Sequence, residues 1–286
     1  MSVAIEPMQV APGISMLSVR TPTLPPATHT NAYLIGTREC VLVEPASPFA
    51  EEIERLGGWV EEHLRRGFRL RAILLTHHHP DHVGGARALA TRLGVPVWAH
   101  GATRDCLGAA VPIARVVEGG ERIELDGPTQ VTLEAVHTPG HAPGHLCFLA
   151  QQSRALLAGD MVASVGTILV DARDGDMQRY LDSLELMKGL APSQLLPAHG
   201  LPILDAQARL SFYVQHRLAR EAKIHAALVS VGERARIEEL LPVAYADTAP
   251  AAWPFARLAI EAHLIKLERE GRAFRRGDAW SPMPGS

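Results

Sequence analysis

The chain lacks the features that mark secreted or membrane-spanning proteins. Its 286 residues include only three cysteines, Cys40, Cys106 and Cys147, and an odd number at wide spacing argues against a disulfide framework. The sequence does not open with a basic patch and an unbroken apolar stretch, and it contains no apolar run of roughly 18 residues. We therefore expect a cytoplasmic protein with reduced thiols, no secretion signal and no contact with membranes.

The sequence also lacks a large excess of either positive or negative charge. The formal net charge of −3 provides no overall attraction to nucleic acid or to an anionic membrane. The balance is uneven, because residues 207–286 contain 12 Lys and Arg against 9 Asp and Glu. That segment carries +3, which leaves −6 for residues 1–206, so the two parts of the chain differ in charge.

Short apolar runs separated by Pro, Gly and Thr are present, and in residues 13–43 they are typical of a strand meander. Ser47-Pro48 is a good cap and first-turn pair, which predicts a helix to about residue 66. Another helix is predicted at 86–93, and Asp176 can cap one that ends near 188. Further strands are predicted at 70–75, 97–99, 122–125, 131–135, 146–149, 155–158 and 194–196. Two rounds of strands and helices favour an α/β fold with two sheets between helices.

The composition changes after Pro202, where the chain becomes mostly helical. The apolar spacing predicts helices at 208–228, 237–246 and 254–270. Gly271 can end the last helix, and residues 273–280 can form a small hairpin. Three helices and a hairpin are the outline of a winged helix. We therefore predict an α/β domain at 1–206 and a winged-helix-like domain at 207–286.

The most informative segment is Thr-His-His-His-Pro-Asp-His at residues 76–82, directly after an apolar run. It holds four potential metal ligands, His77, His79, Asp81 and His82. Imidazole and carboxylate groups suit zinc and similar divalent ions. Packing alone does not explain so many polar groups at the end of a buried strand, because each is costly to desolvate. This segment predicts a metal centre.

Three more segments place polar side chains directly after apolar strands, where catalytic groups are commonly held. They are His-Thr-Pro-Gly-His-Ala-Pro-Gly-His at 137–145, Gly159-Asp160 and His199-Gly200. With residues 76–82, they resemble the metallo-β-lactamase-fold hydrolase superfamily over about residues 30–202. The resemblance rests on His-x-His-x-Asp-His, Thr-Pro-Gly-His, Gly-Asp and Pro-x-His-Gly in that order.

The resemblance implies an αββα sandwich with two metal ions, which we expect to be zinc, with iron or manganese as alternatives. It assigns His77, His79 and His141 to one ion, Asp81, His82 and His199 to the other, and Asp160 as a bridge. A hydroxide between the ions would attack the substrate. Asp81 would also orient the attacking water or accept its proton.

Other histidines of these segments are not expected to bind metal. His145 is expected to support the ligands from behind. His78 is expected to point the other way, and His137 to be structural or solvent-facing. Glu44 stands where an aspartate is usual in this superfamily. His79 stands where the oxygen-reducing di-iron branch has glutamate, which argues against that branch.

The C-terminal segment resembles one subgroup through His216-Arg217-x-x-Arg220-Glu221 and the stretch at 174–184. That subgroup includes the β-lactamase-like protein 2 group, with an endoribonuclease among its members, and fungal acyl-carrier thioesterases look similar. Arg217 and Arg220 are predicted either to face the metal cleft and bind an anionic substrate group, or to pair with Glu221. Acidic residues interrupt any basic stripe, so a cleft wall or a homodimer contact is favoured over RNA or DNA readout: Glu238, Glu239, Glu268 and Glu270.

The leading prediction is a dinuclear zinc hydrolase of an ester, thioester or lactone, on a small molecule or an acyl carrier. The alternatives are a single-strand endoribonuclease or other phosphodiesterase and a mononuclear iron sulfur dioxygenase. A non-catalytic metal-binding protein is disfavoured because all seven ligand positions are filled.

Overall fold

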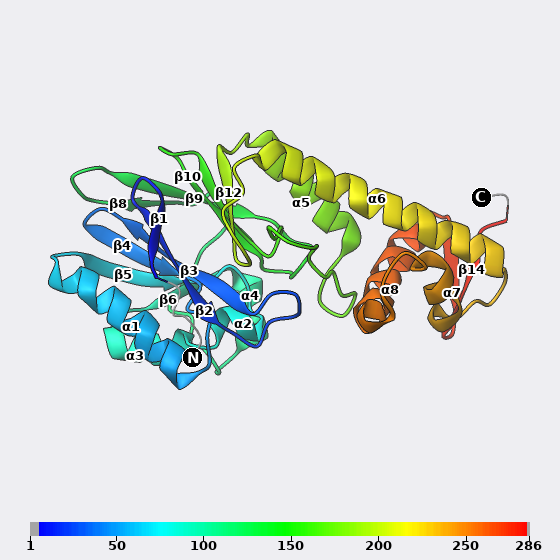
Figure 1. The fold of residues 1–286 in the computed structure, drawn as a ribbon, viewed down its shortest axis with the longest axis horizontal. Coiled ribbons are helices and arrows are strands. Elements are labelled where there is room, and N and C mark those ends of the chain that lie inside the picture. Colours follow the sequence, from blue (N-terminus) through cyan, green and yellow to red (C-terminus); the bar gives the residue numbers. More distant parts are fainter. Residues whose placement is uncertain (1–5, 285–286) are drawn as a thin grey trace.

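The computed structural model describes residues 6–284 as two sheets packed face to face, with helices on the outer side of each. A separate helical unit lies at the end of a long helix, at the right of Figure 1. Among the described helices, none is both long and apolar enough to cross a membrane.

The first sheet has seven strands in chain order. They are β1 (Met8–Ala11), β2 (Ile14–Arg20), β3 (His29–Gly36), β4 (Glu39–Val43), β5 (Arg69–Leu74), β6 (Val97–Ala99) and β7 (Arg115–Val116). Pairing is antiparallel up to β4 and parallel from β4 to β7. Parallel neighbours need crossover connections, and helices supply them here. The helices are α1 (Ala50–Arg65), α2 (Pro80–Val83), α3 (Ala86–Leu93) and α4 (Gly101–Leu107).

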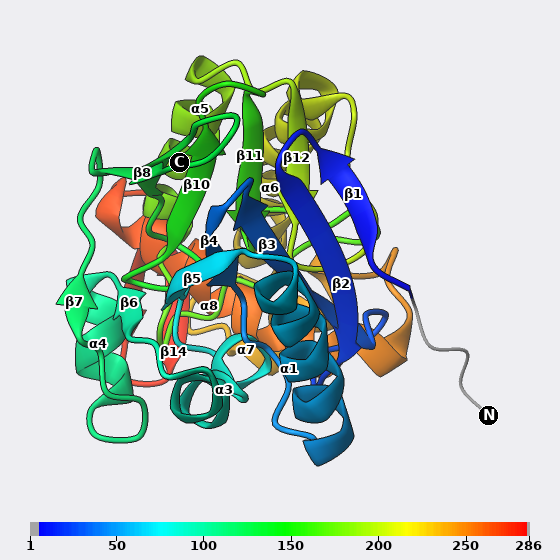
Figure 2. The ribbon, with the colours of Figure 1, turned by 90° about the vertical axis from the view of Figure 1, so that its left-hand side faces the viewer.

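The second sheet has five strands in the order β12-β11-β10-β9-β8. Their bounds are β8 (Arg122–Leu125), β9 (Val131–His137), β10 (Leu146–Ala150), β11 (Ala155–Gly159) and β12 (Gln194–Pro197). Its outer face is covered by α5 (Met177–Gly189) and by the start of α6 (Ala206–Val231), while α1 and α3 cover the first sheet (Figure 2). Tyr33 and Phe148 lie in the apolar layer between the sheets. The predicted two-sheet sandwich between helices is confirmed.

Helix α1 begins later than predicted. Its N-cap is Phe49 and its first residue is Ala50, so Ser47 is not the cap. The Ser47 hydroxyl instead donates to the Arg20 carbonyl and accepts a hydrogen bond from the Phe49 backbone N–H. Those contacts tie the segment before α1 to the end of β2. By contrast, Asp176 caps α5 as predicted, by accepting from the Arg179 backbone N–H.

The C-terminal unit consists of three helices and a hairpin, as the sequence predicts. After α6 come α7 (Ile237–Ala244), a short 3-10 turn (Pro250–Ala252), α8 (Trp253–Arg269), β13 (Ala273–Arg276) and β14 (Ala279–Pro282). Ile260 and Trp280 are in its separate apolar core. Helix α6 belongs to both units, because Tyr213 packs with α5 while Leu228 packs in the C-terminal core. The boundary at 206/207 thus falls within the first turn of a shared helix.

Candidate metal centre

The polar segments that follow β5, β9, β11 and β12 converge at one edge of the sandwich. Strand β5 runs into the loop that holds His77 and His79, and Asp160 directly follows β11. His199 lies two residues beyond the end of β12, which pairs in parallel with β11. Because parallel strands end at the same sheet edge, their following loops meet there. The ligand side chains, which come from separate segments of the sequence, therefore form a compact cluster.

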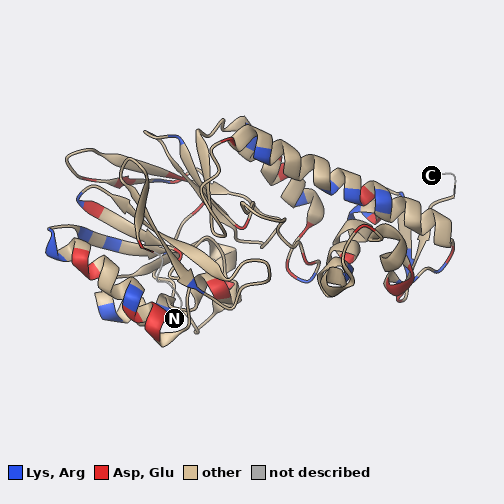
Figure 3. Ribbon diagram, in the orientation of Figure 1, with Lys and Arg blue, Asp and Glu red and all other residues tan. Residues whose placement is uncertain are grey.

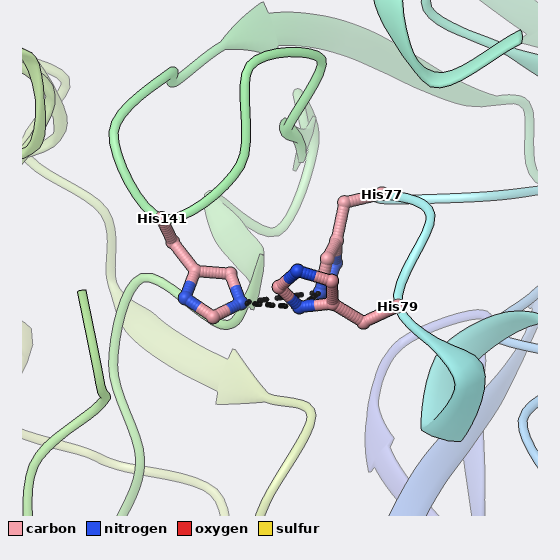
Figure 4. A group of neighbouring side chains, drawn as sticks. All are labelled: His77, His79 and His141. Atoms are coloured by element: carbon pink, nitrogen blue, oxygen red, sulfur yellow. Dashed lines mark hydrogen bonds between the residues drawn. The ribbon is translucent and has the colours of Figure 1, made fainter. Parts of the chain in front are cut away.

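Three histidine rings point at one another in the first half of the cluster (Figure 4). His77 Nε2 lies 3.0 Å from His79 Nδ1, and His141 Nε2 lies 3.2 Å and 2.9 Å from these two atoms. A tetrahedral zinc ion with Zn–N bonds of about 2.0–2.1 Å would hold such nitrogens about 3.3–3.4 Å apart. The observed separations are close to that value, so this half fits a divalent ion.

The second half gathers Asp81, His82 and His199. His82 Nε2 and His199 Nε2 lie 3.7 Å and 3.6 Å from Asp81 Oδ2. Asp160 lies between the halves, because its Oδ1 is 3.5 Å from His82 and 3.3 Å from His199. Its Oδ2 is 3.6 Å from His141 Nε2. One carboxylate therefore presents one oxygen to each half.

Two buried atoms at the centre also fit metal binding. His82 Nε2 and Asp160 Oδ1 have no hydrogen-bond partner within the described part of the chain. Buried polar atoms are normally paired, so unpaired ones that face each other require an explanation. Imidazole and carboxylate donors suit zinc, and also iron. The structure thus brings together all seven predicted ligand residues, whose role as ligands stays a prediction.

The two halves differ in protonation. Burial lowers the pKa of His77 well below its usual value and the pKa of His141 to about 4. Although burial also disfavours a charged His82, Glu44, Asp160 and Asp81 raise its pKa well above the usual value. His77 and His141 therefore present neutral nitrogens, while metal binding at His82 must displace a proton.

The ligand rings are held from behind by groups on the first sheet and on the loops. His141 Nδ1 donates to the Leu169 carbonyl, and His199 Nδ1 donates to the His29 carbonyl, both at 2.9 Å. His77 Nδ1 lies 2.9 Å from the Thr76 hydroxyl. Such contacts choose the tautomer and leave the opposite nitrogen facing the centre.

Two carboxylates support the ligand rings: Glu44, whose supporting contact the sequence left open, and Asp174, which the sequence did not mark as a supporting residue. His82 Nδ1 donates to Glu44 Oε2 at 2.8 Å, and both side chains are buried. Glu44 also has a positive φ of 64°, a strained value for a residue other than glycine. His79 Nε2 donates to Asp174 Oδ2 at 2.6 Å. The Glu44 position could be found from the sequence, because the superfamily usually has aspartate there. The residue type of Asp174 gives no sign of its contact with His79.

His145 lies behind the centre, consistent with its expected supporting role. The Asp160 backbone N–H donates to His145 Nε2 at 3.1 Å, so the other nitrogen, Nδ1, carries the proton and donates to Thr138. His137 Nε2 donates to the Pro143 carbonyl, in keeping with a structural role. His78 does not point away from the site as expected. Its Nε2 lies 3.3 Å from Asp174 Oδ2, the same carboxylate oxygen that His79 contacts.

A cavity of about 730 Å³ opens from the metal centre toward the C-terminal unit. Its walls come from residues 23–27 between β2 and β3, from the loop after β11, and from α6 and α8. Arg217 and Arg220 both line it, and neither forms an ion pair with Glu221. Glu221 instead binds His263 and Lys266, so the predicted pairing with Glu221 is wrong. The C-terminal unit is a wall of the cavity.

Two family models match the chain. One is described as the metallo-beta-lactamase superfamily and matches residues 25–199. The other is described as the beta-lactamase associated winged helix domain and matches residues 237–280. The matches cover most of the sandwich, with all of its ligand segments, and the C-terminal unit from α7 to β14.

Curated relatives include proteins of fungi and of an insect. A lactamase-like protein of Penicillium aethiopicum is 33% identical over 78% of this chain and 68% of its own length. A thioesterase of Emericella nidulans is 35% identical over 70% of this chain and 54% of its own length. The β-lactamase-like protein 2 homologue of Drosophila melanogaster is 29% identical over 85% of this chain and 83% of that protein. This chain therefore spans only about half of the thioesterase.

Solved structures share the fold. A β-lactamase domain protein from Burkholderia ambifaria has a TM-score of 0.85 and 22% identity, over 99% of this chain and 95% of that chain. A smaller likeness is to a protein solved in a di-iron-bound form. It has a TM-score of 0.53 and 28% identity, over 67% of this chain and 98% of that chain.

Proposed function

The chain belongs to the metallo-β-lactamase superfamily, and we propose that it is a dinuclear metal-dependent hydrolase of an ester, thioester or lactone. The single observation that carries this proposal is the position of Asp160, which presents one oxygen to each half of the ligand cluster. A carboxylate shared in this way suits a two-metal site. The thioesterase among the relatives supports the choice of substrate bond.

The ions would make a bound water acidic enough to lose its proton near neutral pH and would polarise the scissile group. The remaining tasks belong to the chain. Asp81 lies in the second half with an oxygen facing the centre, where it can orient the water and accept its proton. Glu44 and Asp174 hold the rings of His82 and His79. The cavity walls align the substrate beside these groups.

We propose zinc as the native metal, because four-coordinate sites rich in histidine favour it. Iron is the alternative, since one solved relative is a di-iron-bound form. Metal analysis of the purified protein tests both the identity and the number of ions. Two zinc ions per chain are expected, whereas a single iron would favour a sulfur dioxygenase.

The test of function is a panel of thioesters, lactones and labelled single-stranded RNA offered to the metal-loaded protein. Thioester or lactone cleavage that a chelator abolishes and zinc restores is the expected result. Cleavage of RNA alone would replace the proposal with the endoribonuclease alternative. Metal-loaded protein that cleaves nothing in the panel would contradict both.

RNA is the second candidate because the same ligands can act on a phosphodiester and Arg217 lines the cavity. The distribution of charged residues on the surface does not favour RNA binding strongly. Figure 3 shows basic and acidic residues interspersed along α6 and through the C-terminal unit, with no continuous basic face in that view. Binding that weakens steeply with added salt would support RNA. A small-molecule or acyl-carrier substrate therefore remains the first proposal.

A further inference from the structure

The end of the cavity farthest from the sandwich is built by the C-terminal unit. His216, Arg217 and Arg220 line it from α6, and Phe255 lines it from α8. None of these residues belongs to the ligand cluster. A substrate whose reacting bond lies at the ligand cluster would meet this wall with another part of the molecule.

Arg217 is a buried cation without a compensating anion. It is only 4% exposed, and its Nη2 donates to the Ile168 carbonyl. Its guanidinium carbon lies 5.2 Å from the centre of the Tyr180 ring, while its Nε is buried with no hydrogen-bond partner. Between residues 6 and 284, no carboxylate lies within ion-pair distance of Arg217. A carbonyl and an aromatic ring do not neutralise a full charge.

Arg220, one turn later, is different. Its Nη1 lies 2.9 Å from Asp247 Oδ1 and donates to the Ala244 carbonyl at 2.6 Å. Its guanidinium also stacks 4.1 Å from the centre of the Tyr245 ring. The charge of Arg220 is therefore already matched within the C-terminal unit, and that of Arg217 is not.

His216 adds an unpaired polar atom beside Arg217. Its Nδ1 is buried without a partner among the residues that the structure describes. Burial, with the charges of Arg217 and Arg220, lowers the pKa of His216 to about 4, so the ring is neutral near pH 7. A neutral ring still has one N–H to donate. Two adjacent residues that line the cavity thus each keep a buried nitrogen without a hydrogen-bond partner in the described part of the chain.

The carboxylates that line the cavity do not supply the missing anion. Asp171 pairs with Arg173, and Asp174 binds the rings of His78 and His79. Asp81 and Asp160 belong to the ligand cluster. Each acidic side chain of the cavity lining is therefore already engaged elsewhere.

Apolar side chains fill much of the remaining lining, including Leu24, Ile168 and Phe255. Leu24 is 48% exposed and lies on the loop between β2 and β3. Such a lining suits an apolar segment that separates the reacting group from a charged end.

We propose that Arg217 and His216 form a subsite for one anionic group of the substrate, a carboxylate or a phosphate. A guanidinium matches both groups through paired N–H donors. The substrate is then an acyl compound with an apolar middle and an anionic end. The inference rests on the proposed hydrolysis, since both ends belong to one molecule.

Three thioesters test the subsite and locate the anionic end. Hexanoyl-pantetheine is uncharged, adipoyl-pantetheine has a carboxylate on the acyl half, and hexanoyl-4′-phosphopantetheine has a phosphate on the thiol half. In Arg217→Gln we expect kcat/KM for one charged substrate to fall by about 10- to 100-fold, the usual effect of losing a charged hydrogen bond. The uncharged substrate should change by less than about 3-fold. Arg217→Lys should restore part of the preference, because it keeps the charge.

The matched control is Arg257→Gln, which removes the same charge from α8 at an exposed ion pair with Glu238. We expect it to leave all three rates unchanged. Equal losses on all three thioesters in Arg217→Gln would overturn the subsite and show that Arg217 only shapes the loop after β11. Unchanged rates on all three would overturn it as well.

A binding measurement separates this inference from the proposed function. Calorimetry on the metal-loaded protein would compare the uncleavable thioethers S-hexyl-pantetheine, S-(5-carboxypentyl)-pantetheine and S-hexyl-4′-phosphopantetheine. A preference for one charged thioether that disappears in Arg217→Gln supports the subsite even if no thioester is hydrolysed. Equal affinities in the wild-type protein would refute the subsite and leave the proposed hydrolysis standing.

Discussion

The metal centre and the C-terminal unit each contain a buried polar cluster, and the two clusters are built in opposite ways. Between α6 and α8, Glu221 accepts from Lys266 Nζ at 2.8 Å and from His263 Nδ1 at 3.2 Å. Opposite charges meet directly there. At the metal centre, by contrast, His77 Nε2 and His141 Nε2 face each other at 3.2 Å, and burial lowers the pKa of both rings. In the first cluster a cation and an anion balance each other, whereas in the second several ligand atoms of the same kind converge.

This difference distinguishes a structural cluster from a binding site. A buried ion pair whose charges cancel is stable as it stands, although replacing it need not be costly. Converging donors of one kind persist only if something else binds them. His263 leaves one buried nitrogen unpaired, while several donors at the metal centre converge on a common point. The convergence, more than the burial, identifies the site.

The largest expected effect comes from removing the shared carboxylate. In Asp160→Asn, we expect zinc to fall from two ions to one per chain and kcat to fall by well over 100-fold. A loss of about 10- to 100-fold is typical when only a supporting contact is removed. Metal analysis and thioester turnover measure both effects. A folded variant with two ions and normal turnover would show that Asp160 is not a bridge.

Breaking the C-terminal cluster should damage stability and spare the chemistry. Glu221→Ala leaves Lys266 without its main buried partner, so we expect the free energy of unfolding to fall by about 3–5 kcal/mol. Urea denaturation measures this change, and metal content should stay at the wild-type value. Glu233→Ala, at an exposed loop position, serves as the control and should change stability by less than about 0.5 kcal/mol. If folded Glu221→Ala lost its metal, the C-terminal cluster could not be regarded as purely structural.

Supporting carboxylates should have intermediate effects, each on its own half of the centre. Asp174→Asn weakens the hold on His79 and Glu44→Gln weakens the hold on His82. We expect about 10- to 100-fold weaker metal affinity in each variant. Chelator competition should show the loss at one ion of the two, a different one in each variant. Unaltered affinities would mean that backbone packing alone orients the rings.

The smallest expected effect is the pH dependence of the C-terminal cluster. Although burial opposes it, His263 and Lys266 lower the pKa of Glu221 below its usual value of 4.5. The resulting stability is complete above that value and is lost as the pH falls through the lowered pKa. Each unit by which the pKa in the folded state lies below that in the unfolded state contributes about 1.4 kcal/mol to the free energy of unfolding. The stability gap between wild type and Glu221→Gln should therefore narrow from pH 7 to pH 3. A constant gap would contradict the assignment.

The sandwich and the ligand cluster were largely predictable, because both depend on local patterns. Apolar strands that end in histidine or aspartate fix where the side chains emerge, and parallel pairing of β11 with β12 brings the ends together. The supporting role of His145 was predicted, but the contact of Asp174 was not. Asp174 reaches His79 across 95 positions of sequence, and nothing local links the two. Their meeting depends on the path of the loop after β11.

The arginine contacts show the same limit. Adjacent residues on a helix point in different directions, so Arg220 does not face Glu221. Arg217 and Glu221 are four positions apart and could meet, but Lys266 and His263 already occupy the carboxylate. The partners of both arginines depend on how α8 packs, which no local pattern in α6 reveals.

If Arg217 binds the anionic end of the substrate as proposed, helix α6 sets the distance between that end and the metal centre. Its 26 residues join the sandwich to the C-terminal unit, and Arg217 lies near its midpoint. A single residue inserted before Arg217 would advance the arginine by about 1.5 Å and turn it by about 100°. Only changes of about seven residues, close to two full turns, would return it to the same side. Relatives that accept longer or shorter substrates should therefore differ here in whole helical periods.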